Sequence, residues 1–574
     1  MLRTIPSHNC PNRVVALLTV FAVVLVFNSS VISIPVGGTS TVPVGNTPIP
    51  AQPLSNVPVP PTDSLSPTRP APPPQPNAVS PTSSIVPSNG SFIITVPGMT
   101  LDLLCPSADP AYCLRAAEAV RSAAGRLTSA VLVSTTARIR VSFFKACESN
   151  RTCPADMLAA TLPTRSFTVL IPEDEGDVRD KRGNETESEP DEKADPPQPS
   201  GTLVEYPQLL LRELGSRQGL VSSSTIQFDD KYDATLQLSA TQDWYLPAPN
   251  LKIRPDQFDL SLVVLHELVH AIGFGGINLL PAGNKMPMLL PVAELQTVKV
   301  RQESSTDGDG GTSEVDQLQV QRFRAPSVFE SRLLVSSSTA SNQDGPQYLV
   351  DLPRSIVSSV TSRLELPAPV DAVSEVLGAP QSSAVASSLF NLATTSNAIL
   401  FATSPAGAGR NSSLQATSKL VMESELSPPI PGSSLAHVSQ SKYSHSPEFL
   451  MTYQIKRGKS LDELILANGA LECGLGPQTL DALRSLGYRI HDKVADRAQL
   501  ANKAPVPLPT TAIVLEGVSV ANSDAQFTPL TPASGHRMPG GLVSNSGTGW
   551  GRRRFAWIAV GGSIMACWMA TRVL

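Results

Sequence analysis

The chain has 574 residues, with 44 Lys and Arg against 49 Asp and Glu, and this length suffices for two to four average domains. The formal net charge of −5 argues against a nucleic-acid partner, because such proteins usually present a basic surface. Many of the 53 prolines fall with Ser and Thr in residues 36–88, so a large N-terminal part is not expected to pack into a domain.

The N-terminus begins with an uncharged apolar run, residues 14–27, which Arg3 and Arg13 precede and small residues follow. This layout is typical of a secretory signal peptide, so residues 1–33 are predicted to be one. An uncleaved signal anchor is the alternative. In either case the body of the protein is expected to enter the secretory pathway. Residues 34–90 then read as a Pro/Ser/Thr-rich linker.

The first folded part is expected at residues 91–278. Residues 114–131 are Ala-rich and amphipathic, which predicts a helix. Residues 138–144 alternate between apolar and polar, as in a strand with one buried face. Residues 224–228 and 236–238 are predicted to be further short strands.

Three other stretches have compositions that favour disorder or linkers. Residues 173–200 are rich in Asp and Glu with few apolar side chains, which predicts a disordered loop. Residues 279–430 are read as a long insertion that is only partly folded, with residues 301–317 as a low-complexity piece. Residues 501–550 are rich in Pro, Ser and Gly and are predicted to be a second linker.

The motif that points to chemistry is H-E-x-x-H, formed by His266, Glu267 and His270. The apolar residues before it recur at helical spacing, and Gly273 would let the helix end. Because residues four apart share one face of a helix, both imidazoles can bind one metal ion. Glu267 can then deprotonate a water whose pKa the metal lowers. The alternative is a core helix with two incidental histidines.

A catalytic zinc site needs a third protein ligand. The compact version of the motif would place a histidine at position 276, which is Gly276, so the ligand must come from further along the chain. The histidines that remain downstream are His437, His445, His491 and His536.

Two downstream segments, Gly432–His437 and Ser446–Thr452, resemble the second half of the site in leishmanolysin-type metallopeptidases, a metzincin family. In that family a long insertion separates H-E-x-x-H from the third histidine, and a methionine turn follows. Thr479–Tyr488 is similar to the family's closing helix with its D-L-G-Y-like end. The resemblance covers roughly residues 220–278 and 325–490, with strong motifs and a loose remainder.

The resemblance implies an α+β zincin-like fold, in which a twisted sheet and the active-site helix precede a mainly helical and irregular C-terminal subdomain at residues 431–500. It implies His266, His270 and a later histidine as zinc ligands. The small-residue loop before His437 favours that residue, with His445 as the alternative. Met451 would form the methionine turn beneath the metal. An ordinary core residue is the alternative.

This chain departs from the family in its spacing, because His437 lies 167 positions after His270. A rival site design takes its third ligand from a Glu about two dozen residues after the motif, where Glu294 stands. Gly273, Met451 and the Leu486–Tyr488 ending argue against that design. The family also keeps itself latent with a pro-segment cysteine, for which Cys105 is a candidate.

The cysteines and glycosylation signals fit an oxidising, extracellular setting. Short-loop pairs Cys105–Cys113 and Cys147–Cys153 are plausible, which leaves Cys473 unpaired or paired elsewhere. Beyond the predicted signal peptide, N-x-S/T acceptors are present at Asn89, Asn150, Asn184 and Asn411.

The C-terminal residues 551–574 include an apolar stretch, 555–571, behind a spacer that ends in three arginines. Small residues upstream make Asn545 or Ser546 a candidate attachment site, so the pattern is that of a glycosylphosphatidylinositol signal. A transmembrane helix is the alternative, but it would put the arginines on the unfavoured side of the membrane.

These patterns together predict a secreted or surface-anchored zinc endopeptidase with one Zn²⁺ per chain and with protein or peptide substrates. The substrate is expected to lie extended along an edge strand. The alternative from another class is a catalytically inactive, glycosylated surface adhesin on a metallopeptidase fold. A third is a structural stalk protein that binds no metal.

Overall fold

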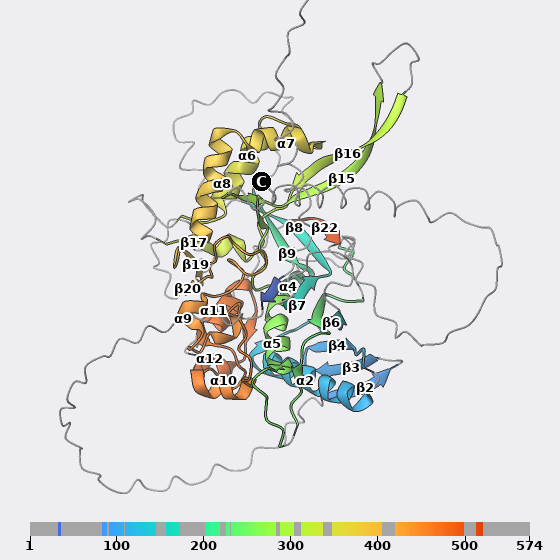
Figure 1. The fold of residues 1–574 in the computed structure, drawn as a ribbon, viewed down its shortest axis with the longest axis vertical. Helices are drawn as coiled ribbons and strands as arrows, with labels where there is room; N and C mark the ends of the chain where they lie inside the picture. The colour runs from blue at the N-terminus through green and yellow to red at the C-terminus, as the bar shows by residue number, and fades with distance from the viewer. Residues whose placement is uncertain are drawn as a thin grey trace, which may run out of the picture. The chain divides into compact units, whose positions relative to one another are not determined.

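A computed structural model describes residues 32–35, 83–88, 91–107, 109–144, 157–172, 201–218, 226–229, 231–248, 250–282, 287–303, 312–336, 347–403, 419–498 and 513–519. All of them belong to one unit within residues 1–529. The architecture mixes helices with several sheets, in agreement with the α+β class (Figure 1). Among the described residues, no helix combines the length and apolar character needed to cross a membrane.

The largest sheet has seven strands in the order β1-β7-β10-β6-β4-β3-β2. Its centre is parallel, because β6 pairs in parallel with both β4 and β10. The other pairs are antiparallel, including β7 with β10 and β1 with β7. The strands are β1 (Ile32–Pro35), β2 (Ser84–Ser88), β3 (Ser91–Val96), β4 (Met99–Leu104), β6 (Ala137–Phe144), β7 (Met157–Pro163) and β10 (Ala234–Ser239).

Two helices, α2 (Pro110–Ala130) and α5 (Leu260–Ala271), pack against each other beside this sheet. The buried face of α2 is mostly alanine, which lets α5 approach closely. Each helix begins at an Asp whose side chain accepts from a first-turn N–H, Asp109 for α2 and Asp259 for α5. Every residue of α5 is buried, so this helix lies at the centre of the core.

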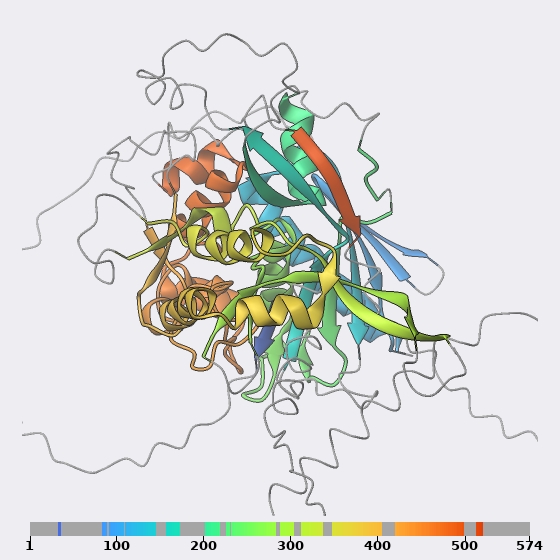
Figure 2. The same ribbon diagram turned by 90° about the horizontal axis from the view of Figure 1, so that it is seen from above.

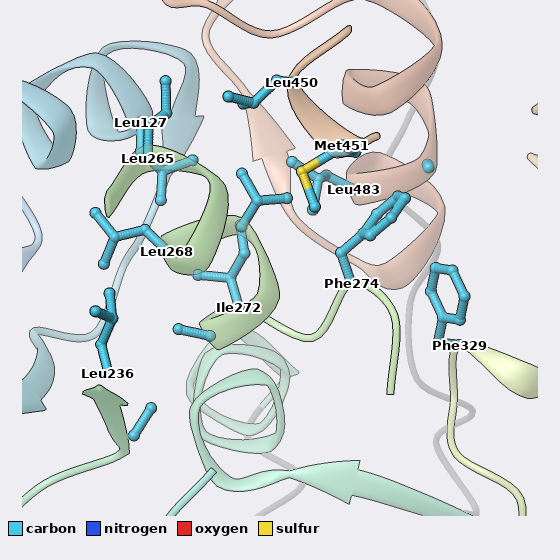
Figure 3. Close-up of a cluster of buried hydrophobic side chains, with 14 of the residues drawn as sticks. Leu127, Leu236, Leu265, Leu268, Ile272, Phe274, Phe329, Leu450, Met451 and Leu483 are labelled. Atoms are coloured by element: carbon cyan, nitrogen blue, oxygen red, sulfur yellow. The ribbon is translucent and has the colours of Figure 1, made fainter. Parts of the chain in front are cut away.

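Figure 3 shows this core from the side of α5, where Leu265 and Leu268 lie among apolar side chains from α2 and β10. At the end of α5 the core continues into an aromatic group. The ring centroid of Phe329 lies 4.9 Å from that of Phe274 and 4.8 Å from that of Phe401. Phe329 and Phe401 belong to the predicted insertion, so the described parts of the insertion around them pack against the end of α5.

Six smaller sheets accompany the largest sheet among the described residues. Three of them have three strands: β22 (Ile513–Ser519), β8 (Arg165–Pro172) and β9 (Gly201–Pro207); β15 (Ala293–Glu303), β16 (Thr312–Phe323) and β18 (Ala368–Pro369); and β17 (Leu333–Val335), β19 (Ile399–Ala402) and β20 (Lys419–Val421). The others pair β11 (Trp244–Tyr245) with β12 (Phe258–Asp259), β13 (Leu279–Pro281) with β14 (Leu289–Pro291), and β21 (Arg489–Ile490) with β5 (Val131–Leu132). Figure 2 shows β15 and β16 as a long two-stranded ribbon.

The remaining helices lie mostly in the second half of the chain. They are α4 (Gln208–Gln218), α6 (Asp351–Thr361), α7 (Val370–Leu377), α8 (Pro380–Ala393), α9 (Gln440–Tyr443), α10 (Leu461–Asn468), α11 (Pro477–Leu486) and α12 (Asp492–Arg497), with 3₁₀ turns η1 (Glu330–Arg332) and η2 (Phe449–Met451).

The predicted helix at 114–131 and the predicted strands at 138–144 and 236–238 are confirmed as α2, β6 and β10. Of the predicted strand at 224–228, the described residues 226–228 have no strand structure, so the prediction is wrong there. Local alternation alone was insufficient there, because a strand also needs a neighbour to complete its hydrogen bonds.

Composition misjudged several short segments. β2 lies in the predicted N-terminal linker, β22 in the predicted C-terminal linker, and β16 begins inside the supposed low-complexity piece. β1 overlaps the last residues of the predicted signal peptide, 1–33. β1, β2 and β22 are short strands at the edges of their sheets, where pairing of backbone groups compensates for an unfavourable composition. β16 is a strand of 12 residues that lies between β15 and β18.

The Cys105–Cys113 disulfide is confirmed, with the two Cα atoms 5.7 Å apart, and Cys473 is a buried free thiol. Cys105 is therefore the wrong candidate for a latency cysteine, because its sulfur is already bonded to Cys113. Other predicted features lie outside the described residues: Cys147, Cys153, Asn89, Asn150, Asn184, Asn411, Asn545, Ser546, residues 173–200 and the tail 551–574.

Candidate metal centre

Helix α5 presents His266 and His270 on one face, with their Nε2 atoms 3.0 Å apart. The run before them is apolar and buried, and Asp259 satisfies the N–H of Ser261 at the helix start. After Ala271 the chain turns away through Gly273 and Gly275, whose φ angles are +102° and +85°. The loop that follows can therefore fold back beside the second histidine.

The third histidine is His437, which lies between β20 and α9. Its Nε2 lies 3.1 Å from that of His266 and 3.3 Å from that of His270. Backbone hydrogen bonds fix the segment on both sides, because Glu423 N–H donates to His437 O and Val438 N–H donates to Met451 O. The structure thus brings all three predicted ligands into one group with the geometry to hold a metal ion.

The opposite nitrogen of each imidazole faces a backbone carbonyl. The Nδ1 atoms of His266, His270 and His437 lie 2.5, 2.8 and 3.1 Å from the carbonyl oxygens of Leu450, Phe274 and Ser433. A carbonyl oxygen only accepts, so each Nδ1 carries the proton and each Nε2 presents a lone pair. Three lone pairs then converge with no proton between them, an arrangement that a bound cation would stabilise.

The spacing of the three nitrogens fits zinc. Nitrogens bound at about 2.0–2.1 Å to one tetrahedral ion lie roughly 3.3 Å apart. The observed separations of 3.0, 3.1 and 3.3 Å approach that value. Three imidazole ligands are also a donor set that catalytic zinc sites use.

Burial keeps these imidazoles neutral, which is the form that binds a metal. His266 and His437 are fully buried and His270 is 4% exposed. Desolvation lowers the pKa of His266 to about 4 and holds the pKa values of His270 and His437 well below the usual range. Each histidine therefore offers its lone pair without first losing a proton at neutral pH.

Glu267 is fully buried beside the histidines. Its Oε2 lies 2.5 Å from the hydroxyl oxygen of Thr161 on β7, whereas its Oε1 has no hydrogen-bond partner among the described residues. Burial raises the pKa of Glu267 to about 8, and the hydrogen bond from Thr161 works against that rise. A carboxyl group of this kind exchanges protons near neutral pH, as a general base must.

Met451 is fully buried in η2. The carbonyl of the residue before it, Leu450, accepts the hydrogen bond from His266 Nδ1. Figure 3 places Met451 beside Leu483 of α11 and near Phe274. Met451 therefore belongs to a segment that touches the site through its backbone and the core through its side chain.

The same segment is tied to α11 by Glu448, a residue that sequence reasoning missed. Its buried carboxylate accepts from the N–H groups of Gln478 and Thr479 and from the Thr479 hydroxyl. The first N–H groups of a helix have no acceptor within the helix, so Glu448 caps the start of α11 and fixes η2 to it. No local pattern reveals the contact, because the partners lie about 30 positions away.

The rival ligands lie elsewhere. His445 is exposed, and its ring nitrogens lie 3.2 and 3.3 Å from the Lys456 amine. Glu294 is on β15 and pairs with Arg322 at 2.7 Å. Neither side chain is part of the histidine group.

A buried polar cluster fixes the loop after α5 to the start of the insertion. Asn278 donates through its side chain to Glu205 and through its backbone to Glu330, both at 2.8 Å. Glu205 is also paired with Arg324, and the Ser327 hydroxyl donates to Gly276 O. This cluster fixes the segment that follows α5. That segment begins with Phe274, whose backbone carbonyl accepts the hydrogen bond of His270.

Gly275 allows the two halves of the site to meet. A Cβ at this position would overlap the Ala436 carbonyl oxygen and approach the His270 ring to 3.1 Å, at a φ of +85°. Gly275→Ala is expected to destabilise the fold by about 2–4 kcal/mol, from overpacking and left-handed strain, and to weaken binding of a metal ion by the three histidines. Denaturant unfolding and zinc stoichiometry would measure both effects.

Gly469→Ala is the matched control. Gly469 has a φ of +67°, but nothing lies within 4 Å of the added Cβ. The Gly469→Ala variant is expected to lose only about 1 kcal/mol of folding stability and to bind a metal ion as the wild type does. Equal effects of the two substitutions would contradict the role of close packing at Gly275.

Comparison with known proteins gives one family match. A family model described as SPBPB7E8-like matches residues 354–506, a stretch that contains His437, Glu448 and Met451 but not α5. No curated protein matches the chain, and no solved structure does.

Proposed function

We propose that this protein is a zinc-dependent endopeptidase of the leishmanolysin-like, metzincin type. The observation that carries the proposal is the convergence of three Nε2 lone pairs, at 3.0 to 3.3 Å, beside a buried carboxylate with one unpartnered oxygen. The site would hold one Zn²⁺ on His266, His270 and His437. The signal-peptide and tail patterns support a secreted or membrane-anchored protein.

The arrangement of the sheet supports the zincin assignment. β7 runs antiparallel to its neighbour β10 and contacts the active-site helix α5. In the structure β1 adds to the outer edge of β7, with Ile32 opposite Thr161 and Ser33 opposite Ala160. That edge therefore accepts an extended segment, and we place the peptide substrate there. Removal of the predicted signal peptide at residue 33 would remove both of these pairing residues.

When bound, zinc would supply a water of lowered pKa and would polarise the peptide carbonyl. The chain's own groups perform the proton transfers. Glu267 takes the proton of the attacking water on Oε1 and later gives it to the leaving amine. The carbonyls of Leu450, Phe274 and Ser433 hold the three imidazoles in the tautomer that points Nε2 inward.

The alternative function, a surface adhesin on the same fold, has one observation in its favour. The β15–β16 ribbon exposes Val300 and Val315, which face each other in register and are 38% and 44% exposed. Such a ribbon is not needed to build the histidine group. The intact Glu267 favours the enzyme, since adhesion has no use for a buried base.

Metal removal tests the proposal directly. The full chain, expressed in a secretory host, is expected to cleave an unfolded protein such as reduced, alkylated casein. A chelator is expected to abolish cleavage, and one equivalent of Zn²⁺ should restore it. Cleavage that survives removal of all zinc would refute the proposal. Stoichiometric zinc without cleavage would favour the adhesin.

A further inference from the structure

We propose that Thr161 is a positioning residue for Glu267. This proposal rests on the proposed peptidase function. Thr161 is 2% exposed on β7, and its hydroxyl oxygen lies 2.5 Å from Oε2 of Glu267. The other carboxylate oxygen, Oε1, is buried and has no partner among the described residues. The hydroxyl thus distinguishes two oxygens that are otherwise equivalent and leaves Oε1 free to take the proton.

The position of Thr161 is rigid. Its backbone lies within β7, which pairs with β10 along its length, and Thr161 stands opposite Leu236. A β-branched side chain has few rotamers, so the direction of the hydroxyl is set by the strand. Because β7 also packs on α5, sheet and helix together fix the distance between Thr161 and Glu267.

The hydroxyl has two acceptors on the same residue. Thr161 Oγ1 lies 3.0 Å from the backbone carbonyl oxygen of Glu267 as well as 2.5 Å from Oε2. Thr161 therefore contacts both the backbone of α5 and the side chain of Glu267, which fixes the carboxylate relative to the helix.

Sequence reasoning missed Thr161 because nothing local marks it. It lies 106 positions before Glu267, in a strand whose pattern reads as ordinary core. Only the packing of β7 against α5 brings the two together.

Kinetics of Thr161→Val and Thr161→Ser test the proposal. Valine keeps the shape and removes the hydroxyl, so kcat is expected to fall about 10- to 100-fold, as for other groups that orient a catalytic residue, with KM within about twofold and zinc unchanged. Serine should restore most of kcat. Thr164→Val is the matched control, because Thr164 is 7% exposed and its hydroxyl has no partner among the described residues. Equal kcat values for the Val and Ser variants would overturn the proposal.

A double-mutant cycle gives a readout independent of activity. Thr161→Val is expected to lower the denaturant midpoint of the full chain, and the shift should be at most half as large in a Glu267→Ala background. Equal shifts in the two backgrounds would overturn the contact. If the wild-type protein shows no chelator-sensitive cleavage, the peptidase proposal fails, while this cycle still decides whether Thr161 holds Glu267.

Discussion

Replacement of Glu267 by Gln is expected to abolish peptide cleavage while zinc remains bound. The amide has nearly the same shape, and its oxygen can still accept from Thr161, but it cannot take a proton. Loss of a general base lowers the rate by about 10²–10⁴-fold. Initial rates on the unfolded substrate, measured for both proteins at equal zinc content, would check this result.

The controls for Glu267→Gln are the zinc content and the folded state of the variant, both of which should match those of the wild type. The ligand nitrogens are unaffected, because His266 and His270 donate hydrogen bonds from Nδ1 to backbone carbonyls and make none with the Glu267 side chain. A variant that retains more than about a tenth of the wild-type rate would show that another group takes the proton from water, and Glu267 would then lose its assigned role.

The second large effect is expected from His437→Ala. This change removes one of three converging nitrogens, so zinc affinity should fall by more than the roughly 10–100-fold that loss of an outer-shell contact causes. His445→Ala is the matched control, because His445 is exposed and lies against Lys456. Metal analysis after dialysis against a weak chelator should find zinc in the His445 variant but not in the His437 variant.

The opposite outcome would overturn the assignment. Zinc retained by the His437 variant and lost from the His445 variant would mean that the segment before Met451 is arranged differently around the metal. Loss from both would point to a general effect on folding, which the denaturant midpoint of each variant would reveal.

The local part of the site was predictable from the sequence. His266, Glu267 and His270 lie on a single helix, and a spacing of four residues fixes their common face regardless of the remaining fold. The Ala-rich run of α2 and the alternation of β6 were predictable for the same reason, since each pattern is complete within one element.

The long-range part was not predictable in this way. The choice between His437 and His445 came from resemblance and a small-residue loop, and the structure supplies the missing reason. Val438 pairs with Met451, and this pairing holds His437 against α5, whereas His445 lies in the outward turn between the two. The roles of Thr161 and Glu448 could not be predicted for a related reason. Their partners lie far along the chain, and neither composition nor local spacing indicates such a contact.

The insertion between His270 and His437 has a thermodynamic consequence. The two ligands lie 167 positions apart, so an ion that binds both would close a very large loop in the unfolded chain. The entropy of closing a flexible loop grows only logarithmically, by about 0.6 kcal/mol for each doubling of length. The insertion can therefore change greatly in length at little cost to the metal affinity of the site. The metal would act as a cross-link whose contribution to the free energy of folding depends only weakly on the length of the insertion.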